Sequence, residues 1–185
     1  MSDFFEKVKA QQDPFKKLVS HLPGFSGYVD RQNRRDADKL VRDTVVRRFE
    51  EHWKRASNFQ NELMKAGKIS FVGDVERAVI QLRTFIDKIK TAPRGYAGLF
   101  DALKINEKEL EALYQFDLAF FDLAEQIGRA LDTLEAALQD DAGLPAAIRN
   151  LTELGRLAVA TYERRSEAIS GESPQQPAGT GPATT

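Results

Sequence analysis

One uninterrupted ladder of apolar residues in the second half of the chain limits the possible folds more than any other feature. Its members lie three or four residues apart, and only an α-helix brings positions with that spacing to one face. They are Leu110, Leu113, Phe116 with Asp117, Phe120, Leu123 with Ala124, Ile127, Leu131, Leu134 and Leu138. A helix of about 33 residues is roughly 50 Å long, whereas the mean helix has about 11–12 residues. The ladder therefore predicts an elongated, all-α, antiparallel bundle.

Three further segments show the same spacing, so we expect a bundle of about four to five helices, two of them long. Their ranges are about 30–66, 75–89 and 145–170. The helix expected at residues 30–66 is the other long helix, and Gly67 is suited to end it. Residues 68–73 fit either a turn or an early start of the next helix. Gly155 lies on the apolar face of the last segment and predicts a close helix crossing there.

The two ends of the chain differ from the middle in composition. Residues 1–29 read as an amphipathic helix and a turn that belong to one domain with the bundle, residues 30–170. Residues 171–185 contain three prolines and no apolar side chain larger than alanine. Such a segment cannot bury enough surface to offset its ordering entropy, so we expect a disordered tail.

The composition narrows the function classes. The chain has no cysteine, which removes thiol catalysis, disulfides and cysteine-ligated zinc, and which fits a reducing cytoplasm. The formal net charge of -1 gives no general attraction to nucleic acid or to an anionic membrane. No apolar stretch reaches the roughly 18 residues of a membrane span, and the first residues do not resemble a signal peptide. We therefore expect a cytoplasmic protein.

Charge is distributed unevenly among the expected helices. Residues 105–140 contain nine acidic and two basic residues, a net of -7, whereas residues 30–66 contain ten basic and seven acidic ones, a net of +3. Such a pattern favours pairing of the acidic helix with a basic neighbour. Because each exposed ion pair contributes only about 0–1 kcal/mol, the pattern bears on which helices are neighbours rather than on stability.

A basic patch opens the long helix of residues 30–66, and a basic helix can bind phosphates. Four acidic residues alternate with its cations, so a solvated, salt-bridged face is the preferred interpretation and nucleic-acid binding the weaker one. The patch consists of Arg31, Arg34, Arg35 and Arg42.

No residue pattern predicts catalysis, a cofactor or a metal site. A di-iron bundle needs Glu three residues before His, but Leu18 and Phe49 stand there before His21 and His52. Asp117 is the polar residue of the ladder, and a buried carboxylate can be functional. The favoured interpretation places it at the margin of the apolar face, paired with an arginine from residues 30–66 or 75–89.

Aromatic and aliphatic residues near the N-terminus and in two loops are candidates for membrane or partner contact. An amphipathic segment with nearby lysines can lie in a membrane interface, but its apolar residues can equally extend the bundle core, and we favour the latter. The candidates are Phe4, Phe5, Val8, Phe25, Tyr28 and Tyr96.

These observations favour a non-enzymatic interaction or scaffold protein that acts through a helix face. Self-association is included in this expectation, because long helices with apolar residues spaced three and four apart also form coiled-coil contacts between chains. The alternative is a peripheral membrane protein that docks through residues 1–22. A ligand pocket between helices stays open, because a sequence does not show cavities.

Overall fold

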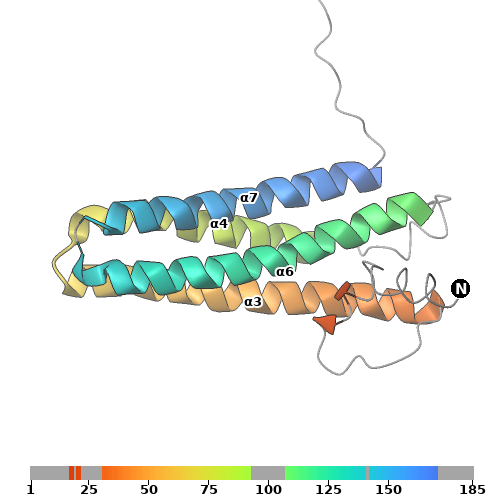
Figure 1. Ribbon diagram of the computed structural model, residues 1–185, viewed down its shortest axis with the longest axis horizontal. Coiled ribbons are helices and arrows are strands. Elements are labelled where there is room, and N and C mark those ends of the chain that lie inside the picture. The colour runs from red at the N-terminus through yellow and green to blue at the C-terminus, as the bar shows by residue number, and fades with distance from the viewer. Residues whose placement is uncertain (1–16, 19, 22–30, 93–106, 141, 171–185) are drawn as a thin grey trace, which may run out of the picture.

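The computed structural model describes residues 17, 18, 20, 21, 31–92, 107–140 and 142–170; for 31–38, 107–112, 169 and 170 it describes the backbone alone. Within these ranges the chain is an all-α bundle without strands, as the periodicity predicts. Its four long helices pack side by side into an elongated body (Figure 1). They are α3 (Arg31–Lys65), α4 (Val72–Thr91), α6 (Glu107–Ala136) and α7 (Leu144–Ser170).

The four helices form two helical hairpins that lie side by side (Figure 1). α3 packs against α4 and α6, and α7 packs against the same two helices, so α4 and α6 occupy opposite corners. Lys90 pairs with Glu50 and Gln60 with Glu76, which makes α3 and α4 antiparallel.

Contacts between the two hairpins are parallel. Arg48 lies over the Phe121 ring and Arg55 binds Asp132, so residue numbers rise together along α3 and α6. The same holds for α4 and α7, where Lys88 binds Glu163. The predicted bundle of long helices is thus confirmed, with antiparallel neighbours within each hairpin and parallel neighbours between the hairpins. Periodicity gives each helix an apolar face but does not specify which helix covers it.

The turn between α3 and α4 is a compact helix cap. Gly67 has a φ of 75°, its N–H donates to Met64 O, and the Lys68 N–H donates to Leu63 O. These two bonds form a Schellman motif, which needs a left-handed residue at the glycine position. A short 3-10 helix, Ile69–Phe71, follows and leads directly into α4. Residues 68–73 are therefore a turn, a 3-10 segment and the first residues of the helix.

Phenylalanine rings fill the centre of the bundle. The rings of Phe49 and Phe85 lie 4.2 Å apart, and Phe85 meets Phe120 edge-on at 5.1 Å. These contacts join α3, α4 and α6, and each side chain is at most 1% exposed. The described ladder residues from Leu113 to Leu134 are mostly buried, which confirms the predicted face of α6.

α4 and α7 cross closely at Gly155, as predicted. A Cβ atom at this position would lie 2.8 Å from the Gln81 Cβ and 3.8 Å from the Ala78 carbonyl oxygen. Only a residue without a side chain lets the two backbones approach this far. The cost of glycine inside a helix is offset by the packing that it permits.

Candidate functional site

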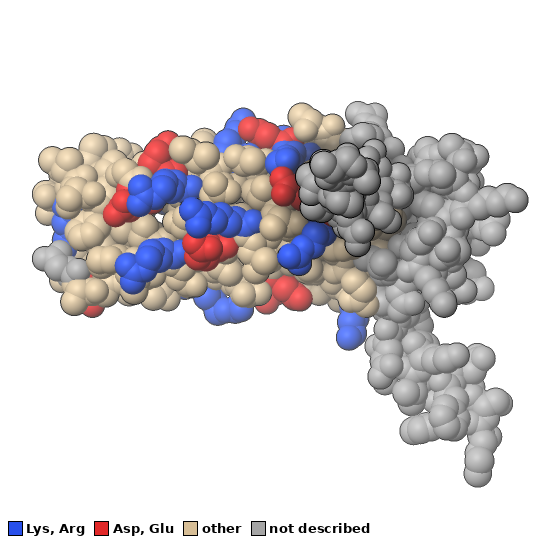
Figure 2. Space-filling view, turned by 90° about the horizontal axis from the view of Figure 1, so that it is seen from above, with Lys and Arg blue, Asp and Glu red and all other residues tan. Residues whose placement is uncertain are grey.

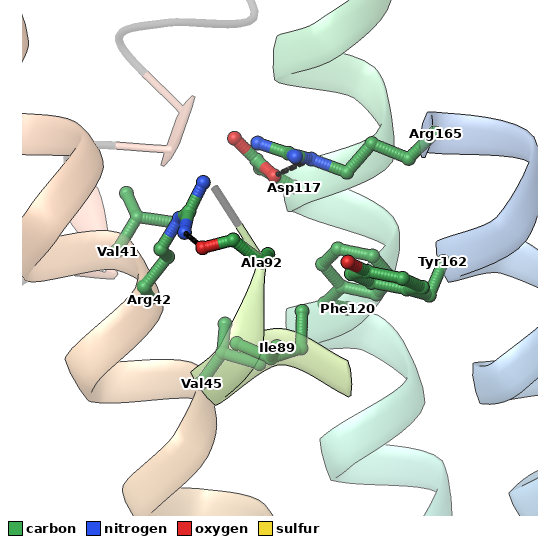
Figure 3. Close-up of a pocket in the computed structure, with 9 residues that line it drawn as sticks. All are labelled: Val41, Arg42, Val45, Ile89, Ala92, Asp117, Phe120, Tyr162 and Arg165. Carbon is green, nitrogen blue, oxygen red and sulfur yellow. Dashed lines mark hydrogen bonds and ion pairs between the residues drawn. The ribbon is translucent and has the colours of Figure 1, made fainter. Parts of the chain in front are cut away.

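A buried ion pair joins α6 to α7 near the end of the bundle at which α4 and α7 finish. Arg165 Nε donates to Asp117 Oδ1 at 2.8 Å, and the two side chains are only 6% and 3% exposed (Figure 3). The expectation of a marginal Asp117 paired with an arginine of α3 or α4 is therefore wrong. The carboxylate lies inside, and its partner comes from α7, 48 residues along the chain.

The surroundings of this pair leave very little space. Apolar side chains of three helices and the Tyr162 ring enclose a cavity of about 10 Å³ beside it (Figure 3). A cavity of about 10–15 Å³ holds a single water molecule. Among the described residues, the space beside the pair therefore suits about one water molecule, and the pair itself joins α6 to α7.

Of the four residues in the predicted basic patch, Arg42 is the one whose side chain is among the described residues. Its Nη1 donates to the Ala92 carbonyl oxygen at 3.1 Å, at the end of α4 (Figure 3). A cation at this position stabilises the negative end of the helix dipole. Arg42 therefore serves the α3–α4 contact. Arg31, Arg34 and Arg35 lie in the first turns of α3, with side chains outside the described residues.

The predicted membrane or partner contacts Phe4, Phe5, Val8, Phe25, Tyr28 and Tyr96 lie outside the described residues. Two residues of the same N-terminal segment are described. Leu18 is 2% exposed, and the His21 ring stacks on Phe121 of α6 with centroids 4.9 Å apart. At these two positions the segment extends the bundle core, which is the interpretation that the sequence favours for it.

Contacts along the α3–α6 seam match the charge segregation of the sequence. Arg55 binds Asp132 at 2.7 Å and Glu135 at 2.9 Å. The hydrogen bond to Glu135 makes the largest contribution to raising the pKa of Arg55, and the hydrogen bond to Asp132 the next largest. One turn earlier, His52 lies against Gly128, where a Cβ would be 3.2 Å from its ring. Burial lowers the pKa of His52 below 6.5, and the charge of Arg55 adds to the effect.

The hairpin end, where both inter-helix turns lie, has a different surface. Ile69, in the α3–α4 turn, is 70% exposed, and Met64, in the last turn of α3, is 50% exposed. In Figure 2, acidic and basic side chains alternate along the middle of the visible face, while the hairpin end carries few. Two apolar side chains are thus presented to solvent on a rigid cap.

A shallow groove of about 470 Å³ lies at the same end, between α6 and α7. Small residues make up most of its lining, and the polar side chains of Asp140 and Asn150 line it as well. Neither this groove nor the exposed turn follows from the three-and-four spacing of the sequence. An isoleucine two residues after the glycine that ends a helix, as Ile69 is after Gly67, indicates an apolar side chain in the turn. The groove has no such signal, because folding brings its two segments together.

The part of the chain that the structure describes holds neither a metal-binding cluster nor a membrane-spanning helix. There, no cluster of three or more His, Cys, Asp or Glu side chains has the proximity that a metal ion needs. No described helix is long and apolar enough to cross a bilayer. Comparisons with known protein families, with curated proteins and with solved structures found no match to this chain.

Proposed function

We propose that this chain is a non-enzymatic interaction protein that binds a protein partner through the hairpin end of its bundle. The observation that carries the proposal is the exposure of Ile69 and Met64 on the α3–α4 turn. Large aliphatic side chains that are exposed to solvent on a rigid element are typical of contact surfaces, because association removes them from water.

The geometry of the turn supports this role. The Schellman motif at Gly67 fixes the turn before any partner arrives, so little conformational entropy is lost on binding. The adjacent bundle has a closely packed aromatic core, which gives the turn a stiff support. A surface of this kind suits recognition by shape and apolar contact.

A scaffold role in the cytoplasm fits the absence of cysteine in the sequence and the long, straight body of the bundle. The distance between the ion-pair end and the hairpin end lets one end bind while the other remains free. The alternative role, membrane docking through residues 1–22, is tested separately by liposome flotation of the full chain. Deletion of those residues must abolish flotation if that role is correct.

The proposal is tested by site-specific photo-cross-linking in an extract of cells that make the protein. A photoreactive phenylalanine analogue replaces Ile69 in one variant and Ile80 in the control. Ile80 is a matched control because it is also an isoleucine, is 50% exposed and lies in the middle of α4. The proposal expects discrete protein adducts from position 69 and not from position 80. Equal labelling at both positions, or none at position 69, would contradict it.

A further inference from the structure

We propose that the partner of the α3–α4 turn is the groove between α6 and α7 on a second copy of the same chain. The proposal rests on the proposed function, because it assigns the partner of that surface. The groove adjoins the α6–α7 turn, and this turn lies at the same end of the bundle as the α3–α4 turn (Figure 1). A chain with both surfaces can therefore bind itself.

The groove has the form that an aliphatic side chain requires. Small residues from both helices leave a hollow of about 470 Å³. The small lining residues are Ala136, Ala137, Gly143, Ala146 and Ala147. The methyl groups of the four alanines offer apolar contact without filling the space.

The turn supplies side chains of matching shape and chemistry. Ile69 projects from the 3-10 segment that follows the helix cap, and Met64 lies in the last turn of α3. Methionine adapts to irregular surfaces because its side chain is unbranched and flexible. Insertion of these two side chains would remove from water Ile69, the most exposed large apolar group of the described residues, and Met64, which is half exposed.

Charge complementarity sets the orientation of the contact. Lys65, the last residue of α3, is exposed and adjacent to Met64. Asp140 lines the groove and is exposed. A lysine beside the inserted turn can therefore face an aspartate beside the hollow. Opposite charges at the rim of an apolar contact steer association and fix its register more than they add affinity.

The same charges favour a second copy over a lipid surface. A bilayer approached by the hairpin end would meet Asp140 as well as the turn, whereas Asp132 and Glu135 are bound by Arg55. Anionic headgroups repel the Asp140 carboxylate and attract lysine and arginine. A second copy, by contrast, uses both Lys65 beside the turn and Asp140 beside the groove.

Turn and groove are different patches, so the contact is heterologous. Two copies related by a two-fold axis would make it twice and form a closed dimer; without closure, the copies would form an open chain. Both forms raise the mass in solution with protein concentration.

The first experiment uses the absence of natural cysteines. Ile69→Cys and Ala137→Cys variants are mixed under mild oxidation, and disulfide-linked dimers are followed over time. The control mixture pairs Ile80→Cys with Ala137→Cys. Docking raises the effective concentration of the two thiols, so the 69–137 product is expected to form at least about tenfold faster than the 80–137 product. Equal rates would overturn the proposal.

The second experiment reverses the charges and measures molar mass by light scattering. Lys65→Glu or Asp140→Lys is expected to weaken self-association by about tenfold, because like charges then face each other. The double variant is expected to restore it. No change in the single variants, or no recovery in the double variant, would contradict the predicted register, and circular dichroism checks that each variant folds.

The outcomes separate this inference from the proposed function. If position 69 cross-links to another protein while the 69–137 disulfide fails to form, the interaction surface stands and the second copy is overturned. If the chain instead floats with phosphatidylserine-containing vesicles and Ile69→Ser abolishes flotation, the second copy is overturned in favour of a lipid surface.

Discussion

The two ends of the bundle use side chains in opposite ways. At one end Asp117 and Arg165 are charged and buried, and at the other Ile69 and Met64 are apolar and exposed. A buried ion pair often adds little net stability, but it penalises every arrangement in which one partner is left alone. Exposed aliphatic groups contribute little to the fold of their own chain. The first end therefore specifies the structure, and the second is available for contact.

The largest expected effect comes from breaking the buried pair. Asp117→Ala leaves Arg165 charged and buried, and the expected loss is about 3–5 kcal/mol of unfolding free energy. Denaturation in urea measures it. In the double variant Asp117→Leu with Arg165→Met, both members of the pair are removed together, so much of this loss is expected to disappear. If Asp117→Ala costs as little as an exposed pair, the contrast between the ends is wrong.

The next effect tests the stiff middle that connects the ends. Gly155→Ala puts a Cβ atom 2.8 Å from the Gln81 Cβ, so α4 and α7 must separate. The expected loss is about 1–3 kcal/mol, despite the better helix propensity of alanine. Gly73→Ala is the matched control, because a Cβ there meets nothing within 4 Å in the same bundle. Thermal unfolding is expected to show destabilisation at position 155 and none at position 73.

A smaller effect concerns pH and the α3–α6 seam. His52 Nδ1 is buried without a hydrogen-bond partner, and Arg48 and Arg55 oppose a further positive charge. Because burial lowers its pKa below 6.5, the unfolded chain binds more protons than the folded one as pH falls. The stability that neutral His52 provides is complete above about pH 6.5 and is lost as pH falls through its lowered folded-state pKa.

The contribution of His52 is isolated by a variant that does not titrate. The melting temperature of the natural chain minus that of His52→Gln is measured across the same pH series, which cancels the other titrating groups. This difference is expected to shrink below about pH 6.5. A difference that stays constant with pH would mean that His52 is not held in its neutral form by the seam.

The smallest effect on stability is expected at the exposed turn. Ile69→Ser should change the unfolding free energy by no more than about 0.5 kcal/mol, because the side chain packs against little of its own chain. Its effect on association should be large by comparison. Chemical denaturation at low protein concentration gives the first quantity. A substantial loss of stability there would show that Ile69 belongs to the fold rather than to an interface.

Much of the fold was predictable from the sequence. The three-and-four spacing placed α3, α4, α6 and α7 within a few residues of their observed bounds, because helix periodicity is a local property. Gly155 predicted the close crossing for a local reason as well. The parallel contacts between hairpins were not predictable in this way, since they depend on how the apolar faces of α3 and α6 pair in space.

The candidate sites were less predictable. Asp117 carried a clear signal as a polar residue on an apolar ladder, but its partner Arg165 lies 48 residues away on another helix. A single sequence does not show which distant cation covers a carboxylate. Arg42 was placed in a basic patch, whereas its guanidinium binds the carbonyl that ends α4. Side-chain direction depends on the packed neighbour, which the charge pattern alone does not reveal.

The most direct test of the account is hydrogen–deuterium exchange of the full chain at low and at high protein concentration. The account predicts that peptides covering the α3–α4 turn and the α6–α7 groove become protected at high concentration. Peptides around Asp117 and Arg165 should exchange equally slowly at both concentrations. Exchange that is independent of concentration at the hairpin end, or protection that develops only around the ion pair, would contradict the division of roles between the two ends.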